Sequence, residues 1–214
     1  MKDAKQAHWD AVYASKAVTS VSWYEPHPRK SLEMIRATGI QPEDPIIDVG
    51  GGASYLVDEL LAAGYRHLTV LDLSAEVLQK LRERLGQRSA SVTLLNQDVT
   101  QFQPRQQYAL WHDRAVFHFL VQHEDRERYV AALRQAVRPN GHVVIATFGP
   151  AGPERCSGLP TMRYDANALA AQLGSDFKLV ESSLAVHHTP SNAPQEFLHC
   201  RFDRQERGDG SRRS

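Results

Sequence analysis

The sequence predicts an α/β fold built on a doubly wound, mostly parallel sheet of seven strands. Short, continuously apolar runs alternate with amphipathic helical segments, which is typical of βαβ units. Strands of this apolar kind are buried on both faces, as in a parallel sheet. The last two strand-like runs follow each other with no helix between them, which indicates an antiparallel hairpin at one edge of the sheet.

The first half of this pattern is regular. Strands are expected at residues 45–49, 67–71 and 91–95. A helix is expected over 53–63, ending at Gly64. The next helix is expected to begin at Ser74, whose hydroxyl suits an N-cap, and to end at Gly86.

The second half continues the alternation and then departs from it. Strands are expected at residues 108–111, 142–148, 177–187 and 196–202. Helices are expected over residues 114–121, 124–137 and 165–173. A loop rich in Gly and Pro is expected over 149–163, and irregular segments of this length in compact domains are usually functional or disordered.

Three parts of the chain are distinguished by this pattern. Residues 1–44 form an N-terminal helical segment, with helices expected over 3–13 and 28–37. Between these helices, 18–26 carries aromatic residues that either close over a ligand or pack on the sheet. Residues 45–203 form the main domain, and the polar tail 204–214 is expected to be disordered.

Composition bounds the function. The 214 residues contain 25 basic and 25 acidic side chains, and this zero net charge argues against a phosphate-neutralising face for duplex nucleic acid. Two cysteines, Cys156 and Cys200, indicate a reducing compartment rather than a disulfide framework. With no apolar run long enough to cross a bilayer and no signal-peptide pattern, we expect a soluble cytoplasmic protein, as a monomer or homodimer. The ten histidines show no metal-ligand spacing, so no metal is expected.

A glycine-rich turn follows the first strand. Gly50, Gly51 and Gly52 stand where this strand turns into a helix, and they let the backbone approach a ligand closely. A dinucleotide fingerprint needs a third spaced glycine at position 55, where Tyr55 stands. Asp48 would also repel a diphosphate, whereas it favours a sulfonium with its α-amino group. The charges therefore indicate S-adenosylmethionine rather than NAD.

Two further acids follow strands. Asp72 ends the second strand, where a carboxylate accepts both ribose hydroxyls of an adenosine, with Leu73 beside it. The alternative is that Asp72 only starts the next helix. Asp98 follows the third strand and is placed to accept from an adenine amino group, while Val99 donates its backbone N–H. The alternative for Asp98 is a solvated loop position.

On these residues, the chain resembles the class I S-adenosylmethionine-dependent methyltransferases over residues 45–203. This resemblance implies a Rossmann-like sheet that ends in a reversed hairpin. Asp48, Gly50 and Gly52 match the family pattern, and Ser54 replaces its usual last glycine. The resemblance assigns the ribose to the acid that ends the second strand and the adenine to the acid that follows the third. More narrowly, the chain is similar to bacterial small methyltransferases of unassigned substrate, through its Ser-Trp-Tyr, Trp-His-Asp-Arg-Ala-Val-Phe-His-Phe and Cys-Ser-Gly-Leu-Pro segments.

Three residues after the fourth strand are the catalytic candidates. By resemblance, His112 or Asp113 contacts the methionine part of the cofactor or the acceptor. His118 is a candidate general base, because histidine titrates near neutral pH. The alternative for His118 is packing within an aromatic cluster.

Other candidates come from loops and the N-terminal segment. Cys156, Arg163 and Tyr164 are expected to shape an acceptor pocket; the alternatives are a structural thiol for Cys156 and an ordinary salt bridge for Arg163. Tyr13 and Trp23 are expected to face the sulfonium through cation–π attraction, with core packing as the alternative.

The predicted function is methyl transfer from S-adenosylmethionine to a small-molecule acceptor. A thiol or chalcogen is suggested by the similarity of Asp-Arg-Ala, at residues 113–115, to a segment of thiopurine-type methyltransferases. Methylation of a protein lysine is the alternative acceptor chemistry. A nicotinamide-dependent oxidoreductase and an inert cofactor-binding protein are the competing classes.

Overall fold

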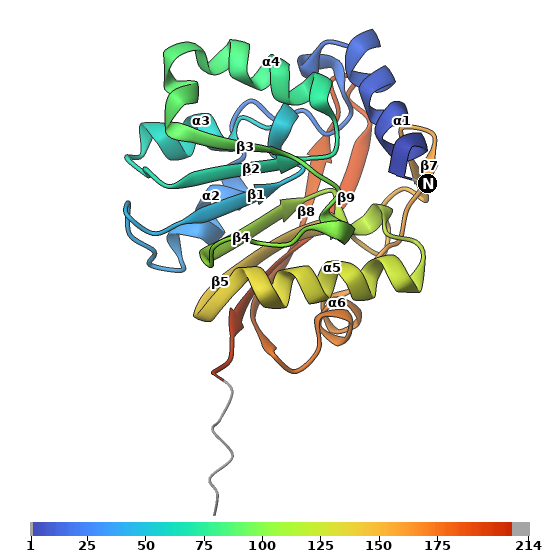
Figure 1. Cartoon of the computed structure of the whole chain (residues 1–214). Coiled ribbons are helices and arrows are strands. Elements are labelled where there is room, and N and C mark those ends of the chain that lie inside the picture. The colour runs from blue at the N-terminus through green and yellow to red at the C-terminus, as the bar shows by residue number, and fades with distance from the viewer. Residues whose placement is uncertain (1, 207–214) are drawn as a thin grey trace, which may run out of the picture.

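The computed structural model describes residues 2–206, which form a seven-stranded sheet covered by helices (Figure 1). The strand order is β3-β2-β1-β4-β5-β9-β8. The first five strands of this order are parallel, and β9 runs antiparallel to both its neighbours, β5 and β8. The strands are β1 (Ile46–Val49), β2 (Leu68–Asp72), β3 (Val92–Asn96), β4 (Tyr108–Arg114), β5 (Val137–Phe148), β8 (Phe177–His188) and β9 (Pro194–Arg204). The predicted fold class, including the C-terminal hairpin, is confirmed.

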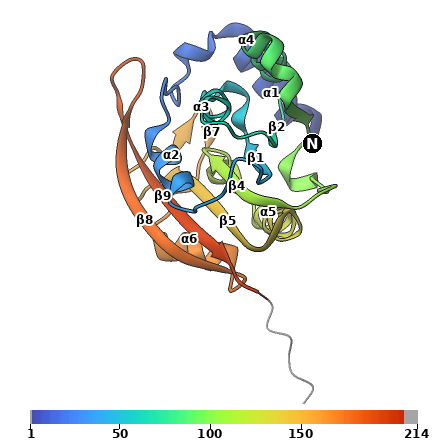
Figure 2. The ribbon, with the colours of Figure 1, turned by 90° about the vertical axis from the view of Figure 1, so that its left-hand side faces the viewer.

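Helices lie on both faces of the sheet (Figure 2). The helices are α1 (Lys2–Ser15), α2 (Arg29–Arg36), α3 (Leu56–Ala62), α4 (Ala75–Leu85), α5 (His123–Ala136) and α6 (Ala166–Leu173). Leucines and isoleucines of α2, α3 and α4 form one core with one face of the sheet, while α5 and α6 pack on a second, more aromatic core around Trp111 and Tyr129. Burial of these apolar side chains is the main force that holds the layers together.

Two predicted helix starts are confirmed at the level of the cap. The Ser74 hydroxyl accepts the backbone N–H of Val77 at 3.3 Å, which satisfies a donor in the first turn of α4. In α6, Asp165 does the same for the N–H of Ala168 at 2.8 Å.

The helix predicted over 114–121 is wrong. β4 continues to Arg114, and only a 3-10 turn, Phe117–Phe119, follows it. The carboxylate of Asp113 accepts the N–H groups of Val116 and Phe117, and Ala115 adopts a φ of 73°. These side-chain bonds compete with the helical ladder, and a left-handed residue interrupts it.

Two further predictions, the start of a helix and the structure of a loop, need smaller corrections. The helix predicted from residue 53 begins only at Leu56, because Ser54 is extended and its hydroxyl accepts the N–H of Leu56. The loop predicted over 149–163 contains a two-stranded ladder of β6 (Arg155–Cys156) and β7 (Leu159–Pro160).

Both ends of the chain partly match expectation. The N-terminal segment contains the two expected helices, α1 and α2, joined by 3-10 turn Val18–Ser20. Of the predicted tail, Arg204 closes β9 and the N–H of Gln205 donates to the carbonyl of Asp176, while 207–214 lies outside the described residues. Among residues 2–206, no helix is long and apolar enough to span a membrane.

Candidate functional site

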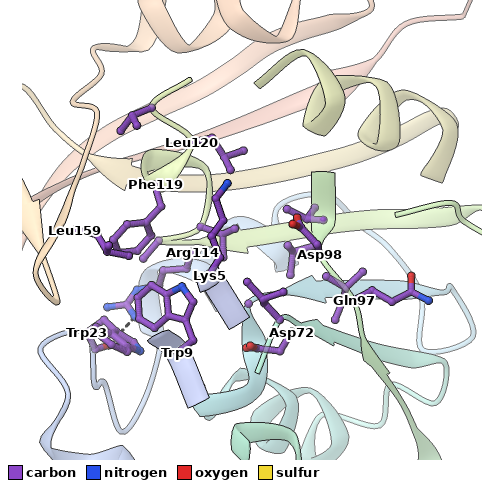
Figure 3. A pocket seen from close by; sticks show the side chains of 18 of the residues that line it. Lys5, Trp9, Trp23, Asp72, Gln97, Asp98, Arg114, Phe119, Leu120 and Leu159 are labelled. Carbon is purple, nitrogen blue, oxygen red and sulfur yellow. Dashed lines mark hydrogen bonds between the residues drawn. The ribbon is translucent and has the colours of Figure 1, made fainter. Parts of the chain in front are cut away.

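A cavity of about 250 Å³ opens at the carboxyl ends of the central parallel strands (Figure 3). This is the edge at which open α/β sheets bind ligands. Of the residues predicted to bind the cofactor, seven line it: Tyr13, Trp23, Gly50, Asp72, Leu73, Asp98 and Val99. Residues that are far apart in the sequence but predicted for one site thus lie around a single cavity.

The glycine turn after β1 is shaped for close approach. Gly50 has a φ of 69°, in the left-handed region that favours glycine, and its N–H donates to the carbonyl of Leu71 at 2.7 Å. A Cβ on Gly52 would lie 2.4 Å from Cγ1 of Val77 and 3.0 Å from Oδ2 of Asp72. Side chains are thus excluded from this turn, so its backbone packs directly against α4 and β2.

Asp72 lies at the end of β2 and is buried. Its two carboxylate oxygens accept the N–H of Gly52 at 3.1 Å and the N–H of Ser74 at 2.9 Å. Burial, opposed by these hydrogen bonds, raises the pKa of Asp72 from its ordinary value of 3.8 to about 6. A carboxylate offers about four acceptor positions, so Asp72 retains acceptor capacity toward the cavity that it lines.

Asp98 lies at the start of a 3-10 turn after β3. Its carboxylate accepts the N–H of Thr100 at 2.9 Å and the hydroxyl of Thr100 at 2.8 Å, both through Oδ1. Among the described residues, Oδ2 of Asp98 accepts no hydrogen bond. Asp98, Val99 and Gln97 all line the cavity, and Figure 3 shows Asp98 and Gln97 on the same side of it as Asp72.

Aromatic side chains of the N-terminal segment cover the cavity. Trp9 contacts Tyr13, Trp23 and Phe119, with ring centroids 6.2, 5.7 and 5.1 Å apart. α1 is fixed to α4 because Ser74 donates its hydroxyl to Asp10. Tyr13 and Trp23 thus line the cavity and also pack in one hydrophobic cluster, so both interpretations of these residues remain open.

A smaller polar cavity of about 20 Å³ adjoins the glycine turn and is lined by Asp48, Gly51, His112 and Arg114, among others. His112 Nδ1 lies 2.7 Å from Oδ1 of Asp48, and His112 Nε2 lies 2.9 Å from the hydroxyl of Ser31 in α2. All three side chains are buried. Oδ2 of Asp48 is buried without a hydrogen-bond partner among the described residues, so this carboxylate has an acceptor to offer a ligand in the polar cavity.

Asp113 does not reach either cavity. Its carboxylate accepts the hydroxyl of Tyr129 at 2.7 Å, besides the N–H groups of Val116 and Phe117. Burial raises the pKa of Asp113 to about 6, and these donors oppose the rise. Its acceptor positions are used within the protein, which favours a structural role.

His118 is fully buried and does not line either cavity. Its ring stacks on Phe148 at 4.3 Å between centroids, and its Nδ1 accepts the N–H of Phe148 at 3.2 Å. Burial and the nearby guanidinium of Arg114 lower the pKa of His118 to about 3. The packing alternative therefore describes its surroundings better than the general-base hypothesis.

The three predicted acceptor residues lie outside both cavities. Cys156 is buried in an aromatic cluster, with its thiol 3.7 Å from the hydroxyl of Ser22. Arg163 pairs with Glu154 at 3.0 Å on the surface, which is the salt bridge weighed as its alternative. Tyr164 is buried against Phe117. Instead, the neighbouring β7 contributes Leu159 and Pro160 to the cavity wall.

Sequence reasoning missed several residues of the site. Arg114 lines both cavities, donates to the carbonyl of Trp23 at 2.8 Å and pairs with Glu25 at 3.1 Å. Gln97 and Phe119 were also missed. The available signal was their position, because each follows a parallel strand near its carboxyl end.

Comparison with known proteins agrees with this site. Residues 46–141 match a family model described as a methyltransferase domain. The chain is 26% identical over 98 residues to an eEF1A lysine and N-terminal methyltransferase of Mus musculus, and 29% identical over 94 residues to that of Danio rerio. These matches cover 45% and 44% of the chain but only 14% and 13% of the relatives' length.

Solved structures share the fold over nearly the whole chain. One comes from work on the conversion of a disulfide bond into a thioacetal group during echinomycin biosynthesis, with a TM-score of 0.76, 17% identity and coverage of 95% of this chain and 93% of that chain. The N-methyltransferase NodS of Bradyrhizobium japonicum, in complex with S-adenosyl-L-homocysteine, gives a TM-score of 0.69, 16% identity and coverage of 92% and 98%.

Residues 46–141 thus match a methyltransferase domain, and the fold is shared with class I S-adenosylmethionine-dependent methyltransferases. S-adenosylmethionine is the cofactor of this class. Among residues 2–206, no cluster of three or more His, Cys, Asp or Glu side chains is arranged to hold a metal ion.

Proposed function

We propose that this protein transfers the methyl group of S-adenosylmethionine to a small-molecule acceptor. The observation that carries the proposal is the arrangement of Asp72 and Asp98 along one cavity, with the glycine turn after β1 between the cavity and Asp48. These groups are spaced over three neighbouring strands, β1, β2 and β3, as the parts of one extended nucleoside-containing ligand require.

Each end of the proposed cofactor has a chemical partner. Asp72, with Leu73 beside it, holds the ribose hydroxyls, and Asp98 with the N–H of Val99 holds the adenine. The orphaned Oδ2 of Asp48 accepts from the ammonium of the methionine part, and Gly50, with its neighbours in the turn, keeps that wall free of side chains. These three carboxylates and the N–H of Val99 thus fit the cofactor from its adenine to its amino group.

The bound cofactor supplies a methyl group already activated on a sulfonium. The chain contributes positioning and exclusion of water, which account for much of the acceleration in such a displacement. Tyr13 and Trp23 line the site, where an aromatic ring attracts a cation that contacts its face. His112 holds the Asp48 carboxylate in place through its Nδ1, and Ser31 fixes the ring of His112 from the other side.

The remaining sequence predictions receive different support. Direct contact between Asp113 and the ligand, and proton abstraction by His118, stay predictions that their burial does not favour. For Cys156, Arg163 and Tyr164 to contact the acceptor, the loop after β5 must move. The thiol or chalcogen acceptor also stays a prediction. A cytoplasmic location is consistent with two free, buried cysteines, Cys156 among them.

The alternatives predict different binding. The relatives named as eEF1A lysine and N-terminal methyltransferases support the lysine alternative, which needs a protein target. An oxidoreductase would bind NADH in preference to S-adenosylmethionine, and an inert binder would show no turnover with any acceptor. The division into an N-terminal cover, residues 1–44, and a cofactor-binding domain, 45–203, is part of the same proposal.

The test is calorimetric titration of the full chain with S-adenosylmethionine, S-adenosylhomocysteine and NADH. We expect the first two to bind and NADH not to bind, and Asp98→Ala to weaken binding by about 1–3 kcal/mol, as for a lost charged acceptor. Asp165→Asn, an exposed helix cap that Asn also satisfies, is the matched control and should bind normally. Preferential binding of NADH, or unchanged affinity in folded Asp98→Ala, would refute the assignment.

A further inference from the structure

One end of the cavity lies away from the acids that hold the proposed cofactor. In Figure 3, Leu159, Phe119 and Trp23 lie together at the end opposite to Gln97 and Asp98. Trp9 lies between these two ends. The wall of this end, called the apolar end, is mainly aliphatic and aromatic, with the guanidinium of Arg114 bound to the carbonyl of Trp23 beside it.

Both basic side chains that line the cavity within residues 2–206 are already paired. Nζ of Lys5 lies 2.7 Å from Asp125, and the guanidinium of Arg114 is bound to Glu25 and to the carbonyl of Trp23. A charged acceptor would lose its hydration without gaining a counter-ion, and an unpaired buried charge is very unfavourable. This arrangement selects an acceptor that is neutral when it binds.

Among the described residues, the cavity wall also offers no free proton acceptor beside the apolar end. Its titratable residues are Lys5, Tyr13, Asp72, Asp98 and Arg114. The two acids lie at the cofactor contacts, and burial raises the pKa of Tyr13, which keeps it protonated. The acceptor atom must therefore attack with a lone pair that it already has, before any proton is removed.

From this geometry, and resting on the proposed function, we infer that the acceptor is a neutral nitrogen on a largely apolar small molecule, such as a heteroaromatic ring or an aryl amine. The nitrogen lone pair forms the new N–C bond to the methyl carbon while the S–C bond breaks and its electron pair stays on sulfur. The positive charge then rests on nitrogen. A secondary amine would afterwards release its N–H proton to water.

The aromatic rings suit this charge movement. In transfer to a neutral nitrogen, one unit of positive charge persists from sulfonium to product, and the faces of Trp9, Trp23 and Phe119 attract a cation throughout. In transfer to a thiolate the charge disappears, so the same rings would favour the reactants over the transition state. A protonated lysine needs a base before it can react. Among the described residues, the wall of the apolar end contains no such base.

A binding experiment separates the charge classes. The full chain loaded with S-adenosylhomocysteine is titrated at pH 8 with three bicyclic probes of similar size: quinoline, 2-naphthoate and 2-naphthylmethylammonium. We expect quinoline to bind at least about ten-fold more tightly than either charged probe. Equal or tighter binding of a charged probe, or no binding of quinoline at millimolar concentration, would overturn the inference. Failure of S-adenosylhomocysteine to bind would instead refute the proposed function.

Trp9→Leu tests the aromatic wall while keeping an apolar side chain. Its affinity for quinoline should fall about ten-fold through the lost aromatic contact, with little change in affinity for S-adenosylhomocysteine, and Tyr65→Leu, which changes an aromatic residue outside the cavity, should alter neither. An equal loss for both ligands would assign Trp9 to the cofactor and count against the inference.

The acceptor atom is identified from the product. A small-molecule extract of the source cells is incubated with the protein and methyl-labelled S-adenosylmethionine, unreacted S-adenosylmethionine is removed by chromatography, and the labelled product is passed over a cation exchanger at pH 3. Retention supports a nitrogen acceptor, because N-methyl products are cationic there. Label in the flow-through would indicate a thioether or ether and overturn the inference, and so would the absence of a labelled small molecule.

Discussion

Replacement of Asp72 by asparagine should stabilise the fold at alkaline pH relative to acid pH, while it weakens cofactor binding. The folded protein binds the Asp72 proton more tightly than the unfolded chain does, since burial raises its pKa from 3.8 to about 6. Raising the pH through this interval therefore costs stability, and the cost is complete above pH 6. The asparagine side chain cannot ionise, so the variant avoids that cost.

The size of this pH effect on stability follows from the pKa of Asp72 in the unfolded and folded states. About two pH units at about 1.36 kcal/mol per unit give an ionisation cost near 3 kcal/mol at pH 8, and only about 1 kcal/mol at pH 4.5. Against this, the amide in Asp72→Asn leaves either the N–H of Gly52 or that of Ser74 without its acceptor, a loss of about 1–3 kcal/mol at both pH values. The stability difference between Asp72→Asn and the natural protein should thus become about 2 kcal/mol more favourable at pH 8 than at pH 4.5.

The assay is urea unfolding of both proteins at pH 4.5 and pH 8, with calorimetric titration of S-adenosylmethionine at pH 8. Asp165→Asn serves as an exposed control and should show the same small difference at both pH values. A pH-independent difference for Asp72→Asn would refute the argument from the buried charge. Unchanged cofactor affinity would refute the ribose contact, whatever the stability data show.

Two other substitutions test the packing of the site. Gly52→Ala places a Cβ 2.4 Å from Cγ1 of Val77, so we expect both a lower melting temperature and loss of measurable cofactor binding; normal affinity would show that the turn tolerates side chains. Tyr129→Phe removes the hydroxyl donated to Asp113 and the acceptor for the indole N–H of Trp111, and it should lower the free energy of unfolding by about 1–3 kcal/mol without a change in cofactor affinity. A loss of affinity in this variant would place the buried network in the binding site.

The fold was predictable because its signals are local. Periodic apolar runs placed all seven strands of the sheet, and the side chains of Ser74 and Asp165 marked helix starts that depend on a single hydrogen bond each. The convergence of the strand-end acids was predictable for a related reason. In a parallel sheet, each strand end points to the same edge, so residues such as Asp72 and Asp98 meet whatever the loops do.

The acceptor end was not predictable, because its residues depend on loop conformations rather than on strand ends. The 114–121 segment has helical periodicity, but the Asp113 carboxylate captures two N–H groups and turns the chain, which directs Phe119 to the cavity and His118 to the core. In the same way, the β6–β7 ladder presents Leu159 to the cavity and leaves Arg163 on the surface.

Asp72 and Asp113 are both buried acids with a pKa near 6, and a comparison of their surroundings indicates a different role for each. Asp113 accepts three donors from within the chain, so its cost is offset locally by a network that shapes the turn after β4. Asp72 also accepts backbone N–H groups, chiefly those of Gly52 and Ser74, but its carboxylate lines a cavity that a ligand can enter. Access to a cavity, more than the raised pKa, therefore distinguishes the proposed binding residue from the structural one.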